Sequence, residues 1–167
     1  MGKRRKKQDM AGPIIFLIAI VMLAIAITGV CIDWISTTTT VGLSTTTTAT
    51  LSDLFEINEK AEIENFALMA SFALATVAAG GIATILYGCS LIIRLRLIKL
   101  VALLLGVIAV IAAIASIITS FTFCSSYSAS VIEGWVESKS SPAIGAWLTA
   151  AGGLLCGISA ALGAAKK

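Results

Sequence analysis

Four long stretches that are almost free of charge constrain this chain of 167 residues more than any other feature. They cover residues 13–32, 66–91, 98–121 and 143–164, and Lys99, near one end, is the only charged residue in them. An α-helix rises 1.5 Å per residue, so roughly 20 apolar residues cross the ~30 Å hydrocarbon core of a bilayer. We therefore predict a mainly α membrane protein with a four-transmembrane-helix bundle.

The composition agrees with this class and argues against enzymes. The chain is 58% hydrophobic and 13% charged, which leaves too little polar surface to cover a water-soluble globule. It contains no histidine, and no pair of its four cysteines has metal-ligand spacing. We expect no enzymatic activity, no metal or other cofactor and no small-molecule substrate.

The distribution of charge orients the predicted helices. Ten of the twelve Lys and Arg residues lie in or next to residues 1–12, 92–97 and 165–167, whereas residues 33–65 and 122–142 hold eight of the nine acidic residues. Short basic flanks stay in the cytoplasm. We therefore expect both termini and the 92–97 turn to be cytoplasmic, and two extracellular loops, with the plasma membrane as the location.

The basic residues 3–7 followed by an apolar stretch resemble a secretory signal peptide. Residues 13–32 are long enough to span a bilayer, however, and Asp33-Trp34-Ile35 lacks a small-x-small cleavage pattern. We interpret the stretch as a retained first helix. Next to a span, basic residues mark orientation and contact anionic lipid, and we favour this over nucleic-acid binding.

Small residues recur every four positions in three of the stretches, and the third contributes Ala112, Ser116 and Ser120. Such a pattern forms a groove along one helix face and lets helix backbones approach closely. Packing inside the bundle is the favoured interpretation, and a lateral contact between copies is the alternative. The helix-packing candidates are Ala67, Ser71, Ala75, Ala79, Gly145, Thr149, Gly153 and Gly157.

The first extracellular loop, residues 33–65, begins with two threonine runs around Gly42. β-Branched residues favour strands, so we predict a β-hairpin with its turn near residues 41–44. The alternative is a disordered or O-glycosylated stalk, but the segment has no proline, and Trp34, Val41, Leu43 and Leu51 can form an apolar face.

A helix over residues 52–64 is predicted to follow the hairpin, with Asp53 as its cap and Glu56 three positions on. It would run directly into the second span. The second loop, residues 122–142, can add one edge strand to the extracellular sheet. Cys31 and Cys124 lie near the outer ends of two predicted helices. They could form a disulfide or remain two buried thiols, and we favour the thiols.

This arrangement resembles the claudin family and its wider group of peripheral myelin protein, epithelial membrane protein and calcium-channel γ-subunit relatives. The resemblance covers the topology and a few local stretches. Ser44 stands where the family has a tryptophan, and the first loop has no cysteine, so the family's loop disulfide is absent. The local stretches that carry the resemblance are Trp34, Gly42-Leu43, the polar helix leading into Phe66-Ala67-Leu68-Met69, and Gly145-Ala146-Trp147-Leu148.

The resemblance implies a structural or adhesion protein that associates with itself, as a homo-oligomer, through its extracellular sheet. An accessory subunit packed beside a larger membrane channel, transporter or other complex is the alternative. A channel or transporter in its own right is disfavoured because the spans lack ionisable groups at membrane depth. The candidate extracellular interaction residues are Trp34, Thr37, Thr38, Thr39, Thr40, Gly42, Leu43, Thr45, Thr46, Thr47 and Thr48.

Overall fold

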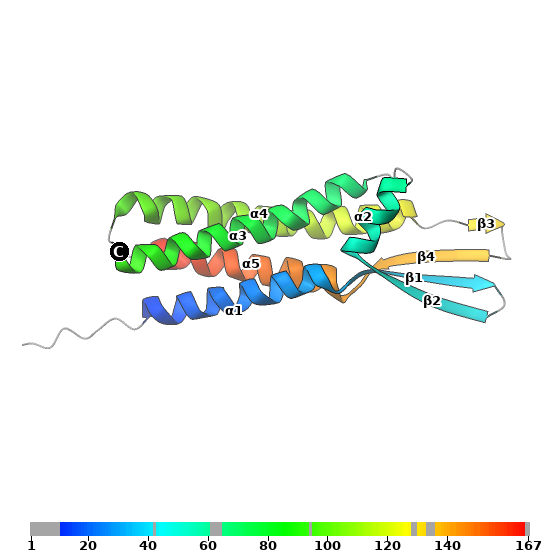
Figure 1. Cartoon of the computed structure of the whole chain (residues 1–167), viewed down its shortest axis with the longest axis horizontal. Helices are drawn as coiled ribbons and strands as arrows, with labels where there is room; N and C mark the ends of the chain where they lie inside the picture. Colours follow the sequence, from blue (N-terminus) through cyan, green and yellow to red (C-terminus); the bar gives the residue numbers. More distant parts are fainter. Residues whose placement is uncertain are drawn as a thin grey trace, which may run out of the picture.

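Four long helices form a bundle, and a small sheet projects from one end of it, which we call the sheet end (Figure 1). The computed structural model describes residues 11–41, 43–60, 65–93, 95–127, 130–132 and 136–165. Within this part of the chain, four helices are long and apolar enough to cross a membrane. They are α1 (Ala11–Cys31), α3 (Phe66–Ile92), α4 (Arg96–Tyr127) and α5 (Ile144–Ala165).

Three of these helices begin and end within two residues of the predicted stretches, because the apolar stretches themselves form the helices. The exception is α4, which continues to Tyr127 through residues predicted to lie in a loop. Its last turns are polar. The hydroxyls of Thr122 and Ser125 donate hydrogen bonds to the carbonyl oxygens of Ile118 and Thr122, 3.0 and 2.7 Å away, within the same helix.

The sheet is antiparallel and four-stranded in the described residues, with the order β2-β1-β4-β3. The predicted hairpin is formed by β1 (Asp33–Val41) and β2 (Leu43–Thr50). The second loop contributes β3 (Ser130–Ile132) and β4 (Val136–Pro142). The prediction of one edge strand from this loop was wrong, since β4 pairs with β1 inside the sheet and the short β3 forms the edge.

Helix α2 (Leu51–Lys60) follows the hairpin and packs on the bundle at the sheet end (Figure 1). The prediction that it runs directly into the next helix was wrong. Asn65, immediately before α3, has a φ of 64°, in the left-handed region, which a right-handed helix cannot contain. Two separate helices therefore meet here at an angle, and residues 61–64 of the predicted helix lie outside the described residues.

The glycine-rich helix α5 is the central helix of the bundle and approaches α1 at van der Waals distance. A Cβ atom added at Gly152 would lie 2.7 Å from the backbone nitrogen of Ala26 and 2.8 Å from the carbonyl oxygen of Met22. One turn away, the Thr149 hydroxyl donates a hydrogen bond to the Ala26 carbonyl oxygen at 3.3 Å. Only glycine permits this separation of the two backbones.

The same helix contacts α4 and α3 through other small residues. Gly157 faces Gly106 of α4, where a Cβ on either residue would lie within 2.8 Å of the other's carbonyl oxygen. Towards α3, the Cys156 thiol lies 3.1 Å from the Thr84 hydroxyl and 3.6 Å from the Gly80 carbonyl oxygen. Helix α5 thus packs against all three neighbours through side chains of minimal size.

Replacement of Gly152 by valine tests this packing. We expect Gly152→Val to lower the free energy of unfolding by roughly 1–3 kcal/mol or more, because the added atoms overlap the α1 backbone. The matched control is Ala151→Val, at an exposed position of the same helix, with a change within about 0.5 kcal/mol. Unfolding in a graded mixture of mild detergent and dodecyl sulfate measures both, and equal effects would contradict the packing.

Candidate interaction surface

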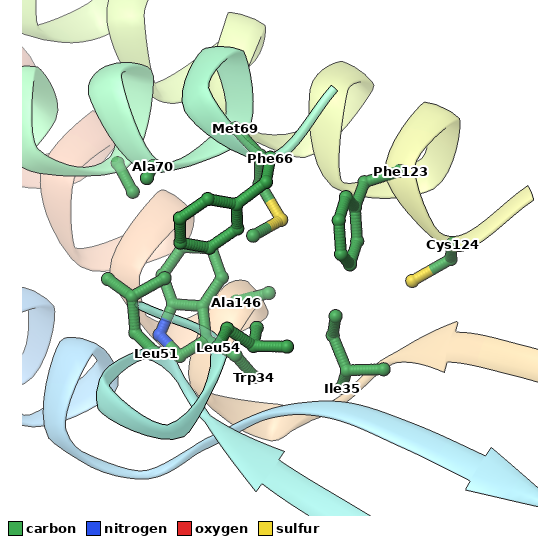
Figure 2. Packing of buried hydrophobic residues seen from close by; sticks show 11 residues of the cluster. Trp34, Ile35, Leu51, Leu54, Phe66, Met69, Ala70, Phe123, Cys124 and Ala146 are labelled. Atoms are coloured by element: carbon green, nitrogen blue, oxygen red, sulfur yellow. The ribbon is translucent and has the colours of Figure 1, made fainter. Parts of the chain in front are cut away.

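The sheet is joined to the bundle by a compact apolar core, the junction core, which contains Trp34 (Figure 2). Trp34 is completely buried, and its indole Nε1–H donates a hydrogen bond to the Gly29 carbonyl oxygen of α1 at 2.8 Å. The tryptophan therefore holds the first strand to the bundle and is not on the exposed surface where we predicted it. The core consists of Trp34, Ile35, Leu51, Leu54, Phe66, Met69, Ala70, Ala73, Phe123, Cys124 and Ala146.

Aromatic rings connect α2, α3 and α4 within and beside this core. The Phe66 ring lies edge-on to Phe55 and to Phe123, with centroids 4.9 and 6.2 Å away. Such edge-to-face pairs stabilise a contact beyond the area that they bury. Helix α2 is therefore held against the bundle through one apolar side, with Leu51 and Leu54 buried and Phe55 half exposed.

The described side chains of the sheet beyond the junction core do not form the predicted apolar face. Trp34 and Leu51 are in the core, and Leu43 at the hairpin tip is 85% exposed. The side chain of Val41 lies outside the description. A threonine-rich strand has β-branched methyl groups on both faces, so it needs no separate apolar face to keep its extended shape.

Hydroxyl groups line both faces of this projecting sheet. Thr37 Oγ1 and Ser140 Oγ are 3.0 Å apart across β1 and β4, and Thr38 Oγ1 and Thr46 Oγ1 are 3.4 Å apart across β1 and β2. Thr37, Thr38 and Thr39 are half-buried, whereas the remaining candidate threonines are exposed. Gly42 lies outside the described residues. The exposed threonines are Thr40, Thr45, Thr46, Thr47 and Thr48.

Strand β2 lies at the edge of the sheet within the described part of the chain. Its other side pairs with β1 from Leu43 to Thr50, and residues 43–48 are exposed. The strand contains no charged residue and no proline, the two features that commonly prevent edge strands from pairing with other chains. Backbone N–H and C=O groups along this edge are thus available to another strand.

A capping box, in which two residues bond each other's backbone, sets the start of α2. The carboxylate of Asp53 accepts hydrogen bonds from the Thr50 backbone N–H at 2.9 Å and the Thr50 hydroxyl at 2.8 Å, and the Asp53 N–H donates to Thr50 Oγ1 at 3.2 Å. The predicted cap, Asp53 with Glu56, was therefore wrong by three residues, because Thr50 is the residue that ends the strand. These bonds lower the pKa of Asp53.

The helix-packing candidates fall into two groups. Gly145, Thr149, Gly153 and Gly157 of α5 are buried at helix contacts, as is Ala79 of α3. Ala67, Ser71 and Ala75 are exposed on the outer side of α3, away from the bundle interior. The residues of α3 that sequence reasoning missed lie on its opposite side; they are Ala70, Ala73, Thr76, Gly80 and Thr84.

Among the described residues no disulfide is formed. Cys31 and Cys124, the candidate pair, are both thiols, which was the favoured alternative. Cys124 is buried in the junction core, but Cys31 is exposed at the end of α1 rather than buried as expected.

No group of three or more His, Cys, Asp or Glu side chains within the described residues is placed to hold a metal ion. No family model matches the chain, and no curated protein matches it. A proposal of function therefore rests on the exposed β2 edge and the exposed small residues of α3.

The capping box predicts a pH dependence. Because the folded-state pKa of Asp53 is lowered, its stabilising contribution is fully present above the ordinary aspartate pKa of about 4 and is lost as the pH falls through the lower folded value. Asp53→Asn should reduce thermal stability at neutral pH, and this difference should shrink steadily below about pH 4. Melting curves from pH 7 to pH 2.5 measure it. A difference that does not change with pH would contradict the assignment.

Proposed function

We propose that this chain is an integral membrane protein, in which α1, α3, α4 and α5 cross a bilayer and the sheet and α2 lie outside the cell. We further propose a claudin-like, non-enzymatic structural or adhesion role, in which copies associate through the β2 edge of the extracellular sheet. The single observation that carries this role is the exposed, uncharged and proline-free edge of β2.

Exposed apolar side chains support membrane insertion. Large hydrophobic residues cover the outside of the bundle along its length, including Leu17, Leu104 and Ile111, each more than half exposed. A water-soluble monomer rarely exposes a continuous apolar surface of this extent. In lipid the same surface is matched to its surroundings, and the helical backbone satisfies its own hydrogen bonds.

Aromatic and charged residues support the position and orientation of the bilayer. Trp147 and Phe121 form an exposed edge-to-face pair near the sheet end, with centroids 5.8 Å apart, as expected for residues at a lipid headgroup boundary. From Trp147 to the end of α5 is roughly 27 Å, close to the ~30 Å hydrocarbon thickness. At the opposite end, Arg96 and Lys99 at the start of α4 agree with a cytoplasmic side.

Pairing of two β2 edges would extend the sheet across two molecules without a side-chain pocket. Main-chain hydrogen bonds supply affinity in this mode of association. Thr46 and Thr47 lie near the middle of β2, so antiparallel copies would bring threonine side chains next to each other. Neighbouring threonines on paired strands are a favourable combination, whereas two like charges are not.

Thr46→Lys tests this edge. The substitution places a lysine in the middle of the exposed strand, and two copies would then bring like charges together. We expect association to weaken by about tenfold or more, equivalent to ~1.4 kcal/mol. Native mass spectrometry of the chain extracted in mild detergent, at a series of concentrations, measures the oligomer fraction.

The matched control is Thr40→Lys, which adds the same charge at an exposed position of β1, an interior strand. Association of this variant should remain close to that of the unmodified chain. Equal loss in both variants would indicate a general effect of charge, and no loss in either would refute pairing through β2.

The exposed small residues of α3 favour a second candidate function, an accessory subunit beside a larger membrane protein. Ala67, Ser71 and Ala75 form a shallow surface on which another transmembrane helix can pack closely. This candidate differs from the first in its partner, because the native particle would contain an unrelated membrane protein in fixed ratio rather than only copies of this chain.

Ser71→Leu separates these two functions. Because Ser71 is exposed, we expect the variant to be expressed and folded like the unmodified chain. If α3 contacts a partner, the variant should lose that protein from the native particle, as determined by affinity purification and mass spectrometry. If Ser71→Leu instead prevents folding, the surface belongs to the bundle and the accessory role fails.

A further inference from the structure

Helices α1 and α3 are close together at one end and separate towards the sheet end (Figure 1). At the far end, the Tyr87 hydroxyl of α3 donates a hydrogen bond to the Gly12 carbonyl oxygen of α1 at 3.0 Å. Gly88, the residue after Tyr87, faces Phe16, which lies one turn after Gly12 on α1. A Cβ added at Gly88 would lie 2.6 Å from the Phe16 ring. At the sheet end, α1, α3 and the segment from Thr50 to Phe55 line an open cavity of about 410 Å³, which we call the wedge.

The walls of the wedge are mainly apolar. Val30 of α1, Leu74 of α3, and Leu51 and Phe55 at the start of α2 supply most of its lining. Leu74 and Phe55 are each nearly half exposed, so the wedge is open to its surroundings. In the proposed orientation, Leu74 lies roughly 12 Å along α3 from Phe66, so the opening reaches from the headgroup region into the outer hydrocarbon layer.

The outer rim of the wedge is polar and acidic. Ser52, Phe55 and Glu59 have the i, i+3, i+7 spacing that places residues on one helix side, and Glu56 lies one turn after Ser52. Thr50, which also lines the wedge, is bonded to the Asp53 carboxylate. Helix α2 contains three acidic residues and one basic residue, Lys60, which is the last residue of the helix. The wedge therefore has a mainly apolar lining, and helical spacing puts Glu56 and Glu59 on the side of α2 that carries the lining residue Ser52.

We propose that the wedge binds one phosphatidylcholine molecule of the outer leaflet, with an acyl chain along Val30 and Leu74 and the choline group near Glu56 and Glu59. An apolar interior fits the acyl chain, and carboxylates attract the cationic end of the headgroup while repelling anionic lipids. The half-exposed Phe55 ring adds an aromatic face, which favours a quaternary ammonium group. This inference rests on the proposed membrane insertion but not on pairing through β2.

Native mass spectrometry of the full chain tests the wedge directly. The purified protein in mild detergent is mixed with equal amounts of phosphatidylcholine and phosphatidylglycerol, and bound lipids are counted. We expect one retained phosphatidylcholine, preferred by about tenfold or more. Leu74→Trp should fill the cavity and reduce this retention by a similar factor. Leu68→Trp is the matched control, with similar exposure on the same helix but outside the wedge lining, and should retain the lipid.

The double variant Glu56→Gln, Glu59→Gln should keep a bound lipid but lose the preference for phosphatidylcholine. Equal retention of both lipids by the unmodified chain, or equal retention by Leu74→Trp and Leu68→Trp, would overturn the proposal.

Failure of the wedge and failure of the proposed function give different results. Thr46→Lys, which blocks the β2 edge, should leave lipid retention unchanged, so loss of association alone does not affect the wedge. Release of the chain from membranes by alkaline carbonate would refute membrane insertion and the wedge together. If the unmodified chain resists extraction by carbonate but shows no preference for phosphatidylcholine, lipid binding in the wedge is refuted while membrane insertion stands.

Discussion

Close approach of helix backbones to α5 is the interaction on which the rest of the structure depends. In the proposed bilayer there is little hydrophobic drive between helices, so association comes from van der Waals contact and hydrogen bonds between them. Gly152 lets α1 approach, and Gly106 and Gly157 let α4 approach. Thr149 and Cys156 add hydrogen bonds on two sides of the same helix. These contacts place α1, α3 and α4 around α5.

The arrangement of α1 also determines where the sheet can form. The first strand begins two residues after α1, and Trp34 fixes it through the bond to Gly29 and the packing of its ring in the junction core. Gly29 is itself pressed against α5, since a Cβ there would lie 2.5 Å from Thr149. The sheet is therefore positioned by the helix contacts, although the described side chains of its outer part are mainly hydroxyl-bearing and form no core of their own. This separation leaves the β2 edge available for association.

Much of the fold follows from local sequence, because length and absence of charge define the four apolar helices and the threonine runs define the hairpin. The mispredicted cap of α2 and the break at Asn65 are local, whereas the other main mispredictions depend on contacts between distant segments. Both sides of α3 carry small residues, and its packing against α4 and α5, which includes the contact between Thr84 and Cys156, decides which side is inside. Likewise Trp34 has the same sequence neighbours whether its ring is exposed or buried, and β4 enters the sheet through pairing across more than 90 residues. The wedge has no sequence signal, since it arises from the divergence of two helices.

The proposed crossing of a bilayer by the four helices, with the sheet outside, is tested most directly by labelling of single cysteines in intact cells. Cysteine is introduced at Leu43, at the tip of the hairpin, or at Leu97, near the start of α4, in a chain whose four native cysteines are replaced by serine or alanine. A membrane-impermeant maleimide should label position 43 in intact cells and position 97 only after permeabilisation. Labelling of position 97 but not position 43 in intact cells would contradict the account, as would labelling of neither.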